Sequence, residues 1–193
     1  MVADSLQIVH TEPFDGTDRL RGAGRVDTAA AIARHAHPDG ARVALTTLAE
    51  DLGGRVDVLH FNPSAFRQED PLHLSVPHLL EDVALGVGAL LTAVQAARPF
   101  LRSGSRVTAT GSMAADKAWH EAASLGVQKA GLRNLVHSLD ATLSPDGIRA
   151  VSVTVRGMLG EEGPFTPARV ADAIHAAAHQ DESSWASEVP YSG

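Results

Sequence analysis

Residues 104–157 constrain the fold of this chain more than any other stretch. They read GSRVTATGSMAADKAWHEAASLGVQKAGLRNLVHSLDATLSPDGIRAVSVTVRG. A β-rich run at 106–110 ends in Gly111-Ser112, and an alanine- and leucine-rich helix carrying Lys129 follows. Pro145-Asp146-Gly147 then turns the chain into a second apolar strand at 148–155. This order predicts a strand–helix–strand unit with polar residues at the carboxyl end of its first strand. Open α/β sheets bind ligands at that end.

The rest of the chain alternates in the same way. Strands are predicted at 5–9, 41–46, 55–61 and 188–191, and helices at 26–37, 48–52, 77–100 and 166–179, the last with Thr166 as its cap and Pro167 in its first turn. Apolar strands that alternate with helices are typical of a mostly parallel sheet covered on both faces. With 193 residues and no linker-like tract, we expect a single domain over 1–193.

Composition excludes several classes of function. The net charge is −7 and no basic cluster is seen, which argues against nucleic-acid binding. The chain has no cysteine, so thiolate zinc sites and cysteine nucleophiles are excluded. His35 and His37 form the tightest histidine pair but lack a third ligand, and we predict no metal site. The N-terminus does not resemble a secretory signal, and no run approaches the ~18 apolar residues of a membrane span, so a cytoplasmic protein is expected.

Several segments together resemble the short-chain dehydrogenase/reductase family, over about residues 50–160. DVLHFNPSA, from Asp57, is similar to the family's DVLVNNAG strand and turn, and GSRVTATGS to the strand that delivers its catalytic serine. ASLGVQKAGLRNLVHSL resembles the helix of the YxxxK pair, and DGIRAVSVTVRG the strand before the PG turn. The resemblance implies a Rossmann-like three-layer α/β sandwich. It also implies NAD(P)-dependent oxidation or reduction of a small carbonyl or alcohol.

The resemblance also assigns residues. Ser112 matches the serine that polarises the substrate oxygen, and Lys129 the lysine that holds the cofactor ribose. Asn62 and Arg156 fall in cofactor-binding positions, and Gly22 and Gly24 are what remains of the glycine-rich loop. The helices at 77–100 and 120–143 correspond to the family's interface pair, so a homodimer or homotetramer is expected.

The chain departs from the family at key positions. Leu125 stands where the tyrosine of YxxxK is expected, so the general acid is missing. Leu85 or Gly86 replaces the asparagine that supports a proton-relay water, and Asp27 would put a negative charge beside the diphosphate. His120 and Tyr191 are the candidate substitutes for the tyrosine; His120 has a suitable ordinary pKa.

Each assigned residue also has a purely structural interpretation. Ser112 and Asn62 are common turn residues, Lys129 could be a surface lysine, and Arg156 a solvated loop arginine.

The N-terminal half is shorter than in the family, because only 61 residues precede Asn62. Either 41–46 is the second strand and what normally follows it is deleted, or 8–18 is the third strand and everything before it is deleted. Two functions stay open: an atypical oxidoreductase, and a non-catalytic relative that binds a small molecule or a partner subunit.

Overall fold

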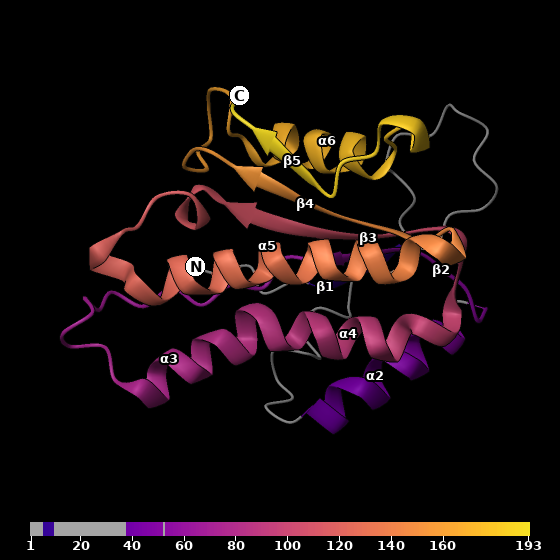
Figure 1. Ribbon diagram of the computed structural model, residues 1–193, viewed down its shortest axis with the longest axis horizontal. Coiled ribbons are helices and arrows are strands. Elements are labelled where there is room, and N and C mark those ends of the chain that lie inside the picture. Colours follow the sequence, from indigo (N-terminus) through magenta and orange to yellow (C-terminus); the bar gives the residue numbers. More distant parts are fainter. Residues whose placement is uncertain (1–5, 10–37, 52) are drawn as a thin grey trace.

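The computed structural model describes residues 6–9, 38–51 and 53–193. Its sheet has the strand order β1-β2-β3-β4-β5 (Figure 1). Strands β2 to β5 pair in parallel, whereas β1 is antiparallel to β2. The bounds are β1 Leu6–Val9, β2 Val56–Phe61, β3 Leu101–Ser112, β4 Arg149–Val155 and β5 Glu188–Tyr191.

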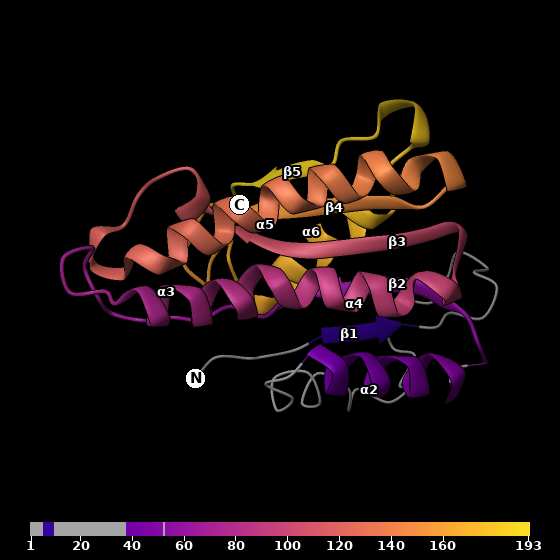
Figure 2. The same cartoon turned by 60° about the horizontal axis from the view of Figure 1, so that its bottom comes forward.

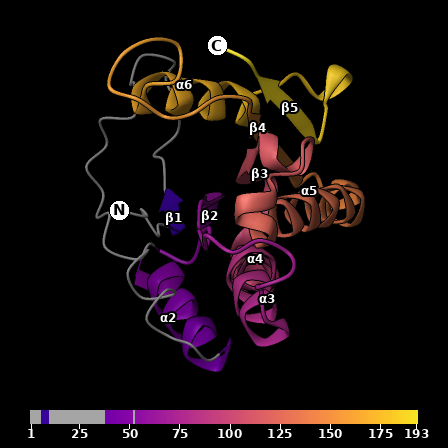
Figure 3. The same ribbon diagram turned by 90° about the vertical axis from the view of Figure 1, so that its left-hand side faces the viewer.

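Helices cover both faces of this sheet, which confirms the predicted three-layer α/β fold (Figure 3). One face packs on α2, α4 and α5 through fully buried side chains such as Leu45, Leu90 and Leu132. The other face packs on α6 through Val151, Val153 and Val170. The helices are α2 Pro38–Asp51, α3 Val76–Val83, α4 Ala89–Ala97, α5 Ala123–Leu143 and α6 Pro167–Ala178, with a π-helical turn, η1, at Ala84–Gly88 between α3 and α4.

Period-two alternation along β3 assigns its side chains to the two faces. Val107 and Ala109 belong to the core beneath α4 and α5. Arg106 points to the other face, where its guanidinium donates to the Ala178 carbonyl at the end of α6. Thr108 and Thr110 alternate onto the same face as Arg106. Strand β3 is therefore apolar toward α5 and carries its polar side chains on the side of α6.

The predicted cap of α6 is confirmed. The Thr166 hydroxyl accepts a hydrogen bond from the Arg169 backbone N–H at 3.4 Å, and Pro167 begins the helix. Proline suits this position because the first N–H groups of a helix have no partner inside it.

The prediction of a strand at 41–46 is wrong, since these residues lie inside helix α2. Pro38 begins that helix, and the short helix predicted at 48–52 is its continuation, ending at Asp51. ARVALT contains alanine, arginine and leucine, which are good helix formers. Leu45, Leu48 and Ala49, at helical spacing, pack into the core against α4, and this packing outweighs the β-branched residues. The interpretation of 41–46 as the second strand of a nucleotide-binding half therefore fails.

The strand predicted at 5–9 is confirmed as β1, but its direction was not foreseen. Leu6 pairs with Phe61 and Val9 with Val58, so β1 begins at the carboxyl edge of the parallel strands and ends at the opposite edge (Figure 2). In a Rossmann sheet the glycine-rich turn follows a parallel strand at the carboxyl edge, a place that β1 does not lead to. Gly22, Gly24, Asp27 and the helix predicted at 26–37 lie outside the described residues, as does most of 8–18.

One stretch, Val76–Phe100, is long and apolar enough to cross a membrane, with a mean hydropathy of 1.5 over its most apolar window. The expectation that no run approaches a membrane span is therefore wrong on length and composition. Core helices of globular proteins meet the same criterion. Here Leu90, Ala93 and Val94 are buried against the sheet and neighbouring helices.

Candidate functional site at the carboxyl edge of the sheet

Parallel pairing brings Ser112, Asn62, Arg156 and Tyr191 to one edge of the sheet. Ser112 at the end of β3 pairs with Val155, and Val155 pairs with Tyr191 at the end of β5. Asn62 and Arg156 directly follow β2 and β4. The arrowheads of β3 and β4 mark this edge in Figure 1. The fold therefore collects these residues where open α/β sheets bind ligands.

Lys129 is the most distinctive group near this edge. Its residue is only 6% exposed, and its amine donates a hydrogen bond to the Thr110 carbonyl, two residues before Ser112, at 3.0 Å. Burial lowers the pKa of Lys129 to about 8, because the charged form loses its hydration. The interpretation of Lys129 as a solvent-exposed surface lysine is thus excluded. An ammonium has three donors, so two remain beyond the bond to Thr110.

Ser112 supports both of its interpretations. Its hydroxyl oxygen accepts a hydrogen bond from the Ala114 N–H at 3.2 Å, which caps the 3-10 turn at Met113–Ala115. This is the turn-stabilising role. The O–H of the same group is a donor that this cap does not use. Ser112 can therefore still donate to a substrate oxygen while holding the turn.

Leu125 lies one helical turn before Lys129 and is half-buried. The residue beside it, Ser124, is engaged elsewhere: its hydroxyl donates to the Asp82 carboxylate on α3 at 2.6 Å.

Tyr191 lies at the carboxyl edge of the sheet, but its hydroxyl donates to the Pro164 carbonyl at 2.5 Å and its ring packs edge-on against Phe165. In this state the phenol anchors the loop at 158–165, and its proton is held by that loop.

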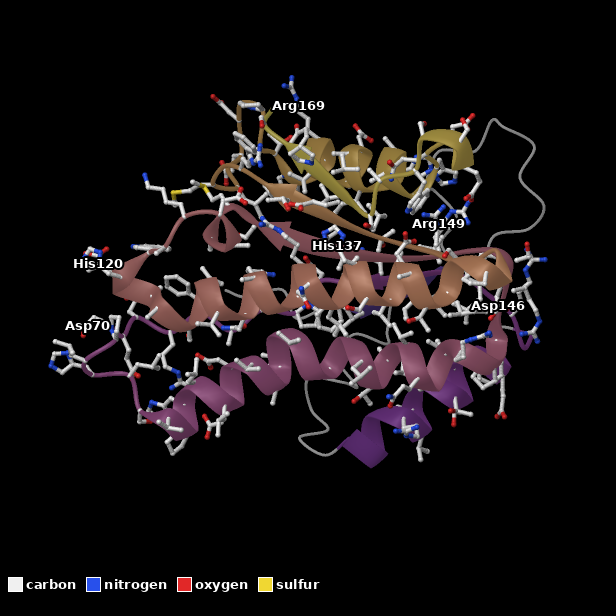
Figure 4. The ribbon with its side chains drawn as sticks, in the orientation of Figure 1. Asp70, His120, His137, Asp146, Arg149 and Arg169 are labelled. Carbon is white, nitrogen blue, oxygen red and sulfur yellow. The ribbon has the colours of Figure 1, made fainter. Side chains whose placement is uncertain are left out.

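His120 lies apart from Ser112 and Lys129. It is exposed in the 3-10 turn at His120–Ala122, where it lines an open hollow with Gln68, Asp70 and Glu121. Figure 4 shows His120 and Asp70 together at one end of the molecule, beyond the start of α5. The chain thus brings Lys129 next to the strand end that carries Ser112, and places His120 on the outer rim.

Arg156 is exposed and paired. Its Nε donates to the Asp116 carboxylate at 3.2 Å, and its backbone N–H donates to the Tyr191 carbonyl at 2.9 Å. Asp116 also accepts from Arg133 on α5 at 2.6 Å, and this hydrogen bond holds the pKa of Asp116 below its usual range. Arg156 thus places a guanidinium at the carboxyl edge of the sheet. Its partner carboxylate, Asp116, is shared with Arg133.

Two buried polar residues, Gln128 and Asp82, and the partly buried His60 were not singled out from the sequence. Gln128 and Asp82 are polar positions on otherwise apolar helix faces, which was the available signal. Burial raises the pKa of Asp82, but hydrogen bonds from Arg67 and Ser124 outweigh that effect and leave it below its usual range. His60 on β2 lies between the hydroxyls of Thr108, at 2.8 Å, and Thr110, at 3.4 Å. Burial lowers the pKa of His60 to about 4.

The sequence matches the model of a known protein family. The family model described as enoyl-(acyl carrier protein) reductase matches residues 49–160, more than half of the chain. The chain belongs to the short-chain dehydrogenase/reductase family. The match spans β2 through β4, including Ser112 and Lys129. Comparison with curated protein sequences found no match.

Solved structures share the fold. A short-chain dehydrogenase from Burkholderia cenocepacia, solved with NADP, is 23% identical with a TM-score of 0.66, over 80% of this chain and 71% of that one. A short-chain dehydrogenase/reductase from Brucella melitensis is 17% identical with a TM-score of 0.70, over 80% and 68%. BdcA, solved with NADPH, is 18% identical with a TM-score of 0.60, over 78% and 70%. At these identities the likeness establishes the Rossmann-like architecture.

Proposed function

We propose that this protein is an atypical NAD(P)-dependent oxidoreductase of the cytoplasm. It would bind NADP or NAD at the carboxyl edge of the sheet and act weakly on a small carbonyl or alcohol. The observation that carries the proposal is the buried Lys129 amine, bonded to Thr110 and keeping two further donors. Two relatives of the same fold were solved with NADP or NADPH.

The residues at this edge fit a dinucleotide in part. Lys129 offers donors to ribose hydroxyls, and burying a cation without a carboxylate partner is costly unless a ligand uses it. Arg156 can bind a phosphate bidentately if it exchanges Asp116 for the ligand. Asn62, which directly follows β2, is proposed to bind the same ligand. The cofactor would supply hydride transfer, while this chain binds and orients it.

Ser112 is proposed to donate to the substrate oxygen, and the missing step is delivery of a proton. Leucine at 125 has none to give, and the Tyr191 proton is held by Pro164. Positioned general acids contribute about 10²–10⁴-fold in rate. Turnover by this chain should be lower than that of a tyrosine-bearing relative by a factor of that size.

A second candidate is a non-catalytic relative that binds a small molecule or a partner subunit, favoured by Leu125. In either case we propose a homodimer or homotetramer through the helices at 77–100 and 120–143. Within one chain, Val87 and Gly131 lie against each other where these two helices meet. Apolar side chains stay exposed along the pair: Val76, Leu80, Leu91 and Val127.

Titration with NADPH and NADH, followed by nicotinamide fluorescence, tests the proposal. We expect at least one to bind below millimolar concentration, and binding of neither would refute the oxidoreductase assignment. Lys129→Ala should weaken that binding about tenfold, the loss expected for one hydrogen bond to a charged group. Lys117→Ala, at the other lysine of the chain, is the matched control. Equal cofactor affinities for the two variants would show that Lys129 does not contact the ribose.

A further inference from the structure

Gly86 in the π-helical turn η1 lies directly against the side chain of Gln128 on α5. A Cβ at position 86 would lie 2.3 Å from Gln128 Oε1 and 2.9 Å from its Cγ. Contacts this short would force Gln128 or the helix to shift, so the observed position of the carboxamide requires glycine at 86. The carboxamide occupies the space that a side chain at position 86 of the long helix would fill.

The hydrogen bonds of Gln128 show what the carboxamide does there. Gln128 is fully buried. Its Oε1 accepts from the Ala65 N–H at 3.1 Å, and its Nε2 donates to the Ala65 carbonyl and to the Ser124 carbonyl, both at 3.3 Å. The carboxamide thus pairs with both backbone groups of Ala65. Its two N–H donors are both used, which leaves none to donate to a water.

A second set of hydrogen bonds holds the loop after β2. Ser124, one turn earlier on α5, donates to Asp82, and Asp82 accepts from the Arg67 guanidinium at 3.1 and 3.2 Å. Residues 124 and 128 are four apart, so they lie on one face of the helix. That face holds the loop after β2 at Ala65 and Arg67.

We infer that Gln128 is the residue that positions the loop after β2 against the Lys129-bearing helix. Its carboxamide does this from α5, in the space left free by Gly86. Asn62 lies three residues before Ala65, and Lys129 directly follows Gln128 along the helix. We call the hydrogen bonds between Gln128 and Ala65 the clamp. The clamp therefore sets the spacing between two proposed cofactor contacts. That consequence rests on the proposed function, whereas the clamp itself does not.

A double-mutant cycle in the ligand-free protein tests the clamp. Gly86→Ala should lower the melting temperature in the wild-type background. The loss should be much smaller in a Gln128→Ala background, because the clashing carboxamide is gone. Gly88→Ala is the matched control in the same π-helical turn, since a Cβ there meets nothing within 4 Å, and it should show no coupling to position 128. Additive effects of Gly86→Ala and Gln128→Ala would overturn the inference.

Hydrogen exchange keeps the inference testable if Gly86→Ala does not fold. In Gln128→Ala the Ala65 amide and its neighbours should exchange about tenfold faster, as expected for the loss of a buried hydrogen bond. Gln95→Ala, at an exposed glutamine of α4, should leave them unchanged. Unchanged exchange in Gln128→Ala would refute the clamp. NADPH affinity is measured in parallel. A wild-type protein that does not bind NADPH refutes the proposed function. The double-mutant cycle and the hydrogen exchange of Ala65 still test the role of Gln128 in that case.

Discussion

The two faces of strand β3 contact two bases that behave differently, the buried Lys129 and the partly buried His60. On the α5 side, the Lys129 amine reaches the carbonyl of Thr110. On the α6 side, the His60 ring lies between the hydroxyls of Thr108 and Thr110. Burial lowers both pKa values, to about 8 for Lys129 and about 4 for His60. Thr110 thus contacts both bases, one through its backbone and one through its side chain.

Lys129 and His60 differ in how many hydrogen-bonding groups each still has available. Both nitrogens of His60 face a threonine hydroxyl, which completes the hydrogen bonding of a neutral imidazole. Lys129 uses one of three donors, and it lies close to the end of β3, where ligands bind. A lowered pKa by itself therefore does not mark a functional group here. The unused donors near the ligand-binding edge distinguish Lys129 from His60.

Adding a proton donor to the Lys129 side should have the largest effect. If a dinucleotide binds, Leu125→Tyr should raise carbonyl reduction about 10²-fold or more, because a phenol one turn before Lys129 supplies the general acid. Turnover of a carbonyl panel with NADPH or NADH measures it. Leu125→Phe matches the size without the hydroxyl. Equal turnover by the two variants, with cofactor bound, would contradict this role of position 125.

Removing the charge of Lys129 should stabilise the protein. The folded pKa of about 8 lies below the usual 10.5, so the cost of burying the charge is fully present below about pH 8. That cost is relieved as pH rises from about 8 to 10.5. Lys129→Met should therefore raise the free energy of unfolding at pH 7 by on the order of 3 kcal/mol.

Urea denaturation at pH 7 and at pH 10 measures this change, and the gain should shrink at the higher pH. A destabilised Lys129→Met at pH 7 would show that the amine makes stronger interactions than the bond to Thr110.

The His60 side should respond to acid. Above pH 6.5 the histidine is neutral in both the folded and the unfolded state and contributes nothing. As pH falls from 6.5 to about 4, only the unfolded chain takes up the proton, so stability is lost, and the loss is complete below about pH 4. With allowance for partial exposure the loss is roughly 2 kcal/mol.

His60→Gln should reduce the pH dependence of unfolding between pH 6.5 and 4 by that amount. His120→Gln, at an exposed histidine on the outer rim, is the control. The same pH profile for His60→Gln as for the wild type would contradict the assignment.

Arg156 should have the smallest effect on stability. Its ion pair with Asp116 is exposed, and such pairs contribute about 0–1 kcal/mol. Arg156→Ala should leave the melting temperature nearly unchanged but weaken binding of NADPH more than binding of NADH if Arg156 contacts the additional phosphate. Unchanged affinities for both would leave Arg156 as a surface arginine that pairs with Asp116.

Much of the fold and part of the site could be predicted from local patterns. Apolar runs and turn residues located β2, β3, β4 and the helix of Lys129. Thr166-Pro167 marked the start of α6. Ser112 and Lys129 were assigned through the resemblance of this segment to the family's strand and helix, and their proximity follows from the β–α–β connection. These features depend on residues close in sequence, so local patterns suffice to find them.

Other features were decided only by contacts between distant segments. The residues at 41–46 suit a helix or a strand, and packing of Leu45 and Ala49 on α4 selects the helix. The direction of β1 depends on its pairing with β2, where Leu6 pairs with Phe61 and Val9 with Val58. A four-residue strand does not encode a pairing so distant in sequence. His120 fell near Ser112 in sequence, yet the loop carries it to the outer rim.

The sequence by itself determined the chemistry present in this protein: a serine, a lysine and a leucine at family positions, and no tyrosine beside the lysine. Only the tertiary structure decided which of these groups are buried and what they contact. Burial lowers the pKa of Lys129, and the missing side chain of Gly86 makes room for Gln128. The physical reason is that hydration and close packing depend on every segment surrounding a residue, most of which lie far from it along the chain.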